Sequence, residues 1–265
     1  MTSAAVLDRA TTDPRSTRPP GVGSVLRAER IKLFSTRSPW WCAALASVIA
    51  IGFGVLVAGT APAGENRIFF TMAGMQFALV LVLVMATIAV SSEYRFGTIR
   101  TTFQTTADRT RVLWTKAAMV AGLALVMGEL IAFATFFLAR LVASDDVLRL
   151  ATAGDWRMVA GHGVVYGLGA MIGVGVGALV RQTAGAISLL LVWTLLVENL
   201  VLLIPNVGQD IARLLPFTNA TLFAGDREVT GVIDPLSTVG SLGVFAASAL
   251  VVMLAATVVV RRRDA

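Results

Sequence analysis

Six long apolar runs constrain this sequence more than any other feature. Crossing roughly 30 Å of hydrocarbon takes about 20 residues of helix, and each run approaches or exceeds that length. The runs are continuously apolar rather than alternating, which favours helices over the strands of a membrane barrel. The sequence therefore predicts an all-α integral membrane protein with six transmembrane helices. The predicted spans cover residues 40–58, 68–90, 113–138, 158–180, 182–204 and 236–260.

The composition excludes an ordinary soluble domain. Of the 265 residues, 56% are hydrophobic and 14% are charged, and the mean hydropathy is +0.79. A soluble domain needs more charged residues to cover its surface. The single cysteine, Cys42, rules out a disulfide framework or a thiolate metal site built within the chain.

The basic residues predict the orientation in the membrane. With the N-terminus in the cytoplasm, 16 of the 22 Lys and Arg residues lie on the cytoplasmic side, as the positive-inside rule requires. Both termini are therefore predicted to be cytoplasmic. This topology and anionic lipid headgroups account for the net charge of +6, so no nucleic-acid partner is expected. Arginine dominates the basic residues, which is typical of GC-rich bacterial genomes and suggests the bacterial cytoplasmic (inner) membrane.

The chain before the first span divides into two parts. Residues 1–23 are polar and contain three prolines, and we expect a disordered cytoplasmic tail there. Residues 24–38 mix basic and apolar side chains, which is typical of an amphipathic helix on the inner leaflet or of a plain basic anchor. Residues 24–265 would then form one multi-pass transmembrane domain.

The polar stretch between the second and third spans is the strongest indication of a partner. Residues 91–116 carry five basic groups against two acids, too many charges for a span. Phe96, Ile99 and Phe103 share one face of a helix, so we predict a short amphipathic helix under the membrane. A helix there is well placed to contact a soluble protein; a solvated loop is the alternative.

Two further patterns concern the outer loop and helix packing. The outer loop at 205–235 contains apolar stretches at 211–217 and 221–224, which predict short helices dipping into the outer leaflet. In the fourth span Gly169, Gly173 and Gly177 recur every four residues, the spacing of close helix packing. The partner helix could belong to the same chain or lie across a dimer.

Few residues offer chemistry inside the spans. Glu129 lies in the third span, and Glu198 and Asn199 lie toward the outer end of the fifth. An ionisable group at a helix centre costs roughly 2.5–3.5 kcal/mol on insertion scales, so all three residues are candidates for a translocation pathway. The alternative is a hydrogen-bonded residue that holds two helices together, which we favour for Glu198. His162, the single histidine, is interpreted as a hydrogen-bonding residue near the interface.

Enzymatic function is not expected. The sequence contains no G-x-x-x-x-G-K-[ST] loop for nucleotide phosphates, and one histidine cannot form an H-E-x-x-H zinc site. Nothing resembles a nucleophile with its base. We therefore expect neither catalytic residues nor a bound cofactor or metal in this chain.

Two stretches resemble a known family. LRAERIKLFSTRSPWW precedes the first span, and SSEYRFGTIRTTFQTTADRTRVLWTKA follows the second. Together they are similar to the permease subunits of ABC-2 type ATP-binding-cassette transporters, particularly small actinobacterial ones. The resemblance implies six spans with a cytoplasmic coupling helix between the second and third. It also implies two permease subunits, as a homo- or heterodimer, on two separate ATPase subunits that bind ATP and Mg. The residues it places at the ATPase contact are Glu93, Tyr94, Arg95, Gly97, Thr98, Ile99 and Arg100.

Three hypotheses about function follow. The first is the membrane half of an ATP-driven exporter of a lipophilic or amphiphilic substrate (a drug, an antibiotic peptide or a lipid), working by alternating access. The second is a proton-coupled secondary carrier that uses Glu129. The third is a non-transporting membrane protein that recruits a cytoplasmic partner.

Overall fold

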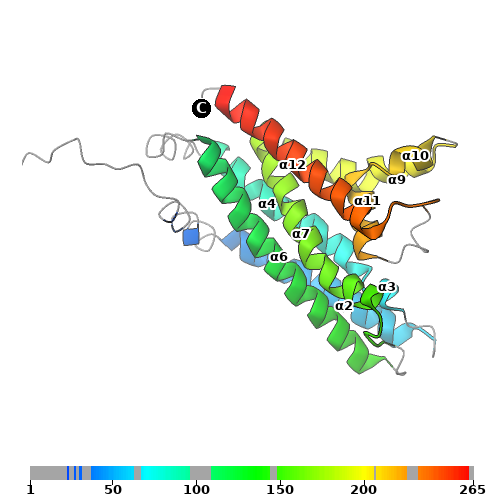
Figure 1. The fold of residues 1–265 in the computed structure, drawn as a ribbon. Helices are drawn as coiled ribbons and strands as arrows, with labels where there is room; N and C mark the ends of the chain where they lie inside the picture. The colour runs from blue at the N-terminus through cyan, green and yellow to red at the C-terminus, as the bar shows by residue number, and fades with distance from the viewer. Residues whose placement is uncertain are drawn as a thin grey trace, which may run out of the picture.

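The computed structural model is a bundle of long helices (Figure 1). It describes residues 23, 27, 30–31, 37–62, 67–95, 109–143, 148–205, 207–225 and 232–262. All but the last residue of the predicted tail and most of the basic segment 24–38 therefore lie outside the described residues, as does the centre of the polar stretch at 96–108.

The described part contains six helical segments that are long and apolar enough to cross a membrane, as the sequence predicts. The all-helical architecture and the six candidate spans confirm that part of the prediction, whereas the cytoplasmic termini, the helix before the first span and the coupling helix stay predictions. The segments are α2 (Arg37–Thr60), α3 (Ile68–Thr71) leading into α4 (Gly74–Arg95), α6 (Arg109–Val142), α7 (Ala153–Val180), α8 (Thr183–Val192) continuing through the π-helix η1 (Trp193–Val197) into α9 (Glu198–Leu202), and α12 (Thr238–Arg262).

α7 is the central helix of the bundle. It packs against α4, α6 and α12 and lies between them in Figure 1. Its glycines allow this, because a helix without side chains on a face can approach its neighbour closely. A Cβ at Gly173 would lie 2.9 Å from Ala86 Cβ on α4, and a Cβ at Gly175 would lie 2.6 Å from Val252 Cγ1 on α12. Glycines therefore bring α7 close to neighbours on two of its sides.

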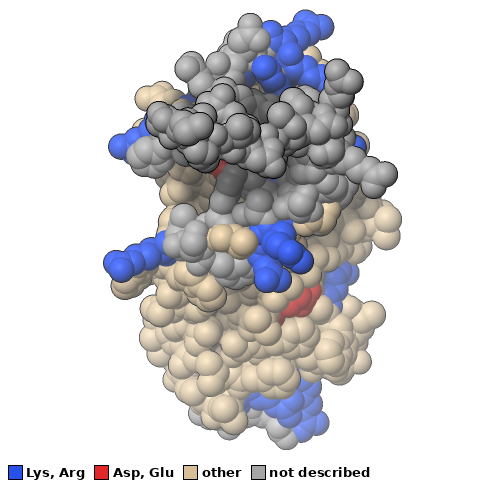
Figure 2. Space-filling model, turned by 90° about the vertical axis from the view of Figure 1, so that its left-hand side faces the viewer, with Lys and Arg blue, Asp and Glu red and all other residues tan. Residues whose placement is uncertain are grey.

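The outer helices expose apolar side chains. α2 buries a stripe that includes Ala46, Ala50 and Gly54, and leaves Trp41 and Val48 exposed. In water such a surface would be costly, whereas lipid tails are as apolar as the side chains themselves. Figure 2 shows a wide tan surface on one face, with the charged side chains confined to small groups.

Two short helices occupy the loop before the last span. α10 (Gly208–Ala212) and α11 (Pro216–Ala224) form where the sequence predicts short helices, with shifted boundaries. Pro216 is the first helical residue of α11, a position where its missing N–H costs no hydrogen bond. α11 packs against α7 and α12, so this loop is a folded part of the bundle.

The two ends of the bundle are distinguished by the elements and residues that they carry. One carries Arg95, Arg109, Arg181 and Arg261, and we call it the basic end; Arg261 Nε donates to Thr110 Oγ1 at 2.8 Å, so α12 finishes beside the start of α6. The opposite end carries α3, α10 and α11, and we call it the loop end. Figure 1 shows the C-terminal end of α12 at the basic end.

Candidate functional site

A buried ion pair joins the two helices that flank the polar stretch. Lys116 Nζ lies 3.0 Å from Glu93 Oε1, and the two side chains are 7% and 10% exposed. Glu93 lies in the last turn of α4 and Lys116 lies seven residues, about two turns, into α6. Charges removed from water are stable only as pairs, so this contact fixes the spacing of the two helix ends.

A second charged contact ties the link between α7 and α8 to the same place. The guanidinium of Arg181 lies 5.0 Å from the centre of the Tyr94 ring. Arg181 ends α7 with a left-handed backbone, φ 58°, and its N–H donates to Gly177 O at 3.0 Å. This conformation is rare for a residue with a side chain, and a cation over an aromatic face is a favourable interaction that holds it.

The residues expected at an ATPase contact fall into two groups. Gly97, Thr98, Ile99 and Arg100 lie outside the described residues. The other three form the end of α4: Arg95 is exposed, Tyr94 is half-buried and Glu93 is buried. Within the chain, the carboxylate of Glu93 is paired with Lys116, and its contact with an ATPase stays a prediction.

At the loop end, Glu198 caps a helix from a distant part of the chain. Its carboxylate accepts hydrogen bonds from the backbone N–H groups of Phe217 at 3.0 Å and Thr218 at 2.6 Å, near the start of α11. The Thr218 hydroxyl and Trp193 Nε1 also donate to it, each at 2.9 Å. The first turn of a helix has free N–H groups and a partial positive charge, so a carboxylate there is stabilised. Glu198 therefore has a clear structural role.

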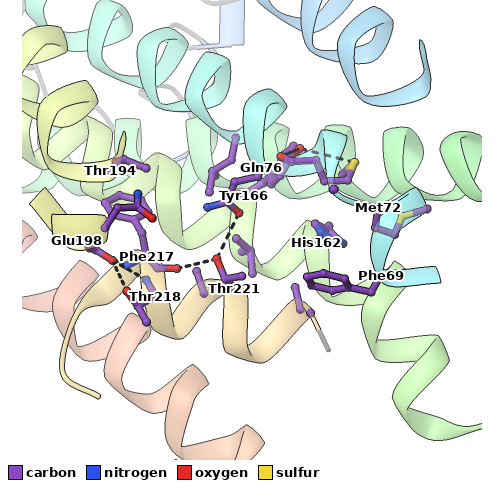
Figure 3. A pocket seen from close by; sticks show the side chains of 18 of the residues that line it. Phe69, Met72, Gln76, His162, Tyr166, Thr194, Glu198, Phe217, Thr218 and Thr221 are labelled. Atoms are coloured by element: carbon purple, nitrogen blue, oxygen red, sulfur yellow. Dashed lines mark hydrogen bonds between the residues drawn. The ribbon is translucent and has the colours of Figure 1, made fainter. Parts of the chain in front are cut away.

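A cavity of about 310 Å³ lies beside this capped helix (Figure 3). Its walls come from α3, α4, α7, the η1–α9 segment and α11. Glu198 and Asn199 both line it. The other polar side chains in its lining are Gln76, His162, Tyr166, Thr194, Thr218 and Thr221.

Most of these polar groups have partners within the chain. Tyr166 donates to Met75 O at 2.8 Å, which ties α7 to the start of α4. Thr221 Oγ1 donates to Gln76 Oε1 at 3.3 Å, as Figure 3 shows. His162 Nδ1 lies 3.4 Å from Val159 O one turn earlier. His162 therefore faces the cavity with one ring nitrogen beside its own helix.

Glu129 does not belong to the cavity. Its half-buried side chain packs against Gly163 of α7, where a Cβ would overlap the carboxylate and Cγ. Within the described part of the chain it makes no hydrogen bond or ion pair. The glycine at 163 thus provides the space that Glu129 occupies, and the structure does not bring Glu129 together with Glu198 and Asn199.

The glycine stripe of α7 faces a neighbour in the same chain. A Cβ at Gly169 would lie 3.0 Å from Leu79 Cδ1, and one at Gly177 would lie 3.0 Å from Thr87 O, both on α4. Together with Gly173, these residues make α7 and α4 a close pair within one subunit.

The described residues contain no cluster of three His, Cys, Asp or Glu side chains that could hold a metal ion. Sequence reasoning missed the Glu93–Lys116 pair and the place of Thr194 in the cavity lining. The pair has a detectable signal, because opposite charges stand at facing ends of consecutive spans. Thr194 has none, because a threonine in an apolar run has no distinctive pattern.

Comparison with known proteins adds no relative: no protein-family model matches the sequence, and no curated protein matches it.

Proposed function

We propose that the chain is the permease subunit of an ATP-driven ABC-2 type exporter, which moves a lipophilic or amphiphilic molecule out of the cell. Two such subunits would associate with two cytoplasmic ATPase subunits that carry the ATP and Mg. The proposal comes from the resemblance of residues 26–41 and 91–117 to those permeases. The basic end is the cytoplasmic end in this proposal.

The Glu93–Lys116 ion pair is the structural observation that best supports the proposal. In this proposal an ATPase would push on residues 96–108. The ion pair joins the end of α4, which precedes this segment, to the beginning of α6, which follows it. A push on a segment with fixed ends moves α4 and α6 as a unit. Both helices pack on α7, and α4 and α7 each line the cavity at the loop end. A movement of α4 and α6 at the basic end would therefore be transmitted to the cavity at the loop end through helices that are packed against one another.

Copurification tests the proposal. The tagged chain is extracted from its native membranes in mild detergent, and copurifying proteins are identified by mass spectrometry. The expected result is a stoichiometric soluble protein with a G-x-x-x-x-G-K-[ST] loop. If no nucleotide-binding protein copurifies under conditions that preserve a known ABC complex in parallel, the exporter proposal fails.

One observation favours the proton-coupled carrier as a second candidate. Glu129 is a carboxyl group in the middle of a span, and it has neither a hydrogen bond nor an ion pair to any described residue. A carrier would transport with a proton gradient and without nucleotide. Transport that collapses on gradient dissipation but survives ATP depletion would favour it. A protein that only recruits a partner would move no substrate under either condition.

A further inference from the structure

Glu129 is a carboxyl group at the edge of a lipid-facing surface. It lies 13 residues before the end of α6, which is about 20 Å along the helix. Its neighbours Leu125, Val126 and Leu130 are exposed, at 41%, 53% and 67%, whereas Glu129 itself is half-buried. Lipid tails are as apolar as these leucine and valine side chains, so a span can leave them exposed. A carboxyl group at the same place needs a separate explanation.

α7 leaves room for this side chain. Gly163 lies opposite Glu129, and a Cβ at this glycine would overlap Oε1, Cγ and Cδ of the glutamate. The carboxylate therefore lies against the backbone of α7, on the line along which α6 and α7 pack. Its position is set by both helices, so a ligand group would meet it at a fixed place.

The carboxylate is both unpaired and accessible. The two helices that hold it, α6 and α7, are described along their whole lengths. Within the described part of the chain Glu129 makes no hydrogen bond and no ion pair. Its oxygens are not among the described side-chain atoms that combine full burial with the lack of a partner, so a molecule outside the protein can reach them. A charge without a counter-charge is costly in an apolar medium, and a cation at this carboxylate would lower that cost.

Aromatic side chains lie between Glu129 and the loop end. Phe133 is four residues further along α6, on the same face of the helix. The centre of its ring lies 6.4 Å from that of Trp156 on α7 and 6.3 Å from that of Phe137. Trp156 and Phe137 are 51% and 55% exposed, so the aromatic group reaches the surface. The faces of aromatic rings attract cations and also pack against apolar groups.

The nearest basic residues along the two helices do not pair with Glu129. Arg140 of α6 lies 11 residues beyond Glu129, and Arg157 of α7 lies 6 residues before Gly163. Arg157 Nη1 donates to Thr238 Oγ1 at 3.2 Å, so this side chain is directed toward α12. In a medium of low dielectric constant the charge of Glu129 therefore attracts a cation and repels an anion.

We propose that the surface formed by Glu129, Phe133, Phe137 and Trp156, which we call the α6–α7 site, binds an amphiphilic organic cation. The ammonium group of the ligand pairs with the Glu129 carboxylate, and its apolar body lies against the three aromatic rings. This inference deepens the proposed export function, on which its physiological meaning rests, because it names the charge of the substrate and the place where it leaves the lipid. The binding itself requires neither ATP nor a second protein.

A matched pair of fluorescent probes tests the proposal on the full chain in phosphatidylcholine nanodiscs without nucleotide. Dansylcadaverine ends in an ammonium group, and dansyl-aminohexanoate carries the same fluorophore and a similar alkyl chain but ends in a carboxylate. Binding to empty nanodiscs is subtracted, because both probes also enter lipid. We expect saturable binding of the cationic probe at one site per chain, with an affinity at least about tenfold higher than that of the anionic probe.

Two charge variants locate the ammonium group. Glu129→Gln removes the charge and keeps the shape, and we expect it to weaken binding of dansylcadaverine at least about tenfold and to abolish the preference over the anionic probe. Asp210→Asn is the matched control, because it changes the net charge by the same amount at an exposed residue of α10, a helix that packs on α9. Its affinity should equal that of the wild type.

Two aromatic variants locate the apolar body. Phe133→Leu replaces the ring by an apolar side chain and should weaken binding of dansylcadaverine about two- to fivefold, the effect of one lost contact between a cation and a ring. Phe77→Leu is the control, because Phe77 is another ring at the surface, on α4, with its centre 6.3 Å from that of Phe53 on α2. This change should leave the affinity unaltered.

Thermal unfolding shows whether each variant is folded; if Glu129→Gln is not, the ratio of the two probes and Phe133→Leu decide. Equal affinity of the two probes, or equal binding in Glu129→Gln, Asp210→Asn and wild type, would overturn the proposal. The absence of saturable binding, as when a second copy of the chain covers the α6–α7 site, would overturn it too. A copurified ATPase with no probe binding would leave the exporter proposal standing without this site. Probe binding with no ATPase would do the reverse.

Discussion

Lys116 of α6 and Glu93 of α4 form an ion pair of 3.0 Å, with both side chains at most 10% exposed. Twenty-three residues of chain separate them, including the segment 96–108 that lies outside the described residues. The pair fixes the two helix ends relative to each other, whatever the segment between them contacts. Because both charges are buried, their contact compensates part of the cost of removing each from water.

The first prediction concerns this pair. Glu93→Gln or Lys116→Met alone removes one member of this buried pair and leaves the other charge without it, and each should lower the free energy of unfolding by about 3–5 kcal/mol. The double variant removes both charges and should recover most of that loss. Unfolding of the purified protein in detergent measures all three. If the two single effects simply add in the double variant, the pair does not act as a unit.

The second prediction separates partner binding from folding. Arg95 ends α4 and is exposed, unlike Glu93. Under the proposed function, Arg95→Glu should insert and fold normally yet lose the copurifying ATPase. Arg262→Glu, an equally exposed change at the end of α12, is the control and should retain the ATPase. Retention of the partner by both variants would contradict a contact at Arg95.

The third prediction concerns the close approach of α7 and α4. A Cβ at Gly173 would meet Ala86 Cβ at 2.9 Å and Leu83 O at 3.0 Å, and backbone cannot easily move aside. Gly173→Ala should therefore destabilise the protein by about 1–3 kcal/mol. Gly122→Ala in α6 has nothing within 4 Å of the new Cβ and should be neutral or slightly stabilising. Thermal unfolding of the two variants measures the contrast, and equal midpoints would refute the packing argument.

The fourth prediction concerns Glu198 as the cap of α11. Glu198→Ala removes the acceptor of two backbone N–H groups, which should destabilise the start of α11 by about 0.5–2 kcal/mol. Hydrogen exchange should then become faster at Phe217 and Thr218 than elsewhere in the bundle. Asp210→Asn, on the neighbouring helix α10, leaves these bonds intact and should leave exchange in α11 unchanged. Unaltered exchange in Glu198→Ala would show that the cap contributes little.

The fifth prediction concerns Glu129. Gly163→Ala should destabilise the protein because the new Cβ overlaps the Glu129 side chain. Adding Glu129→Ala removes the three atoms nearest to that Cβ and should relieve the effect. Glu129→Gln keeps the shape and should retain normal amounts of protein in the membrane while altering transport. Loss of Glu129→Gln from the membrane would indicate a purely structural role.

The six spans can be predicted from the residues alone, because hydrophobic length and backbone hydrogen bonding within a helix are local properties. The predicted third span, 113–138, is observed as the longer α6 (Arg109–Val142), since helical bonding continues into polar residues. The two short helices before the last span follow from the same local signals.

Which side chains contact one another depends on how the helices pack, and the residues alone do not predict it. Glu93 pairs with Lys116, Glu198 caps α11, and the glycine stripe of α7 faces α4 of the same chain. Each of these contacts depends on the rotation of one helix about its axis relative to another. An almost uniformly apolar helix carries no amphipathic pattern to specify that rotation, so packing has to determine it.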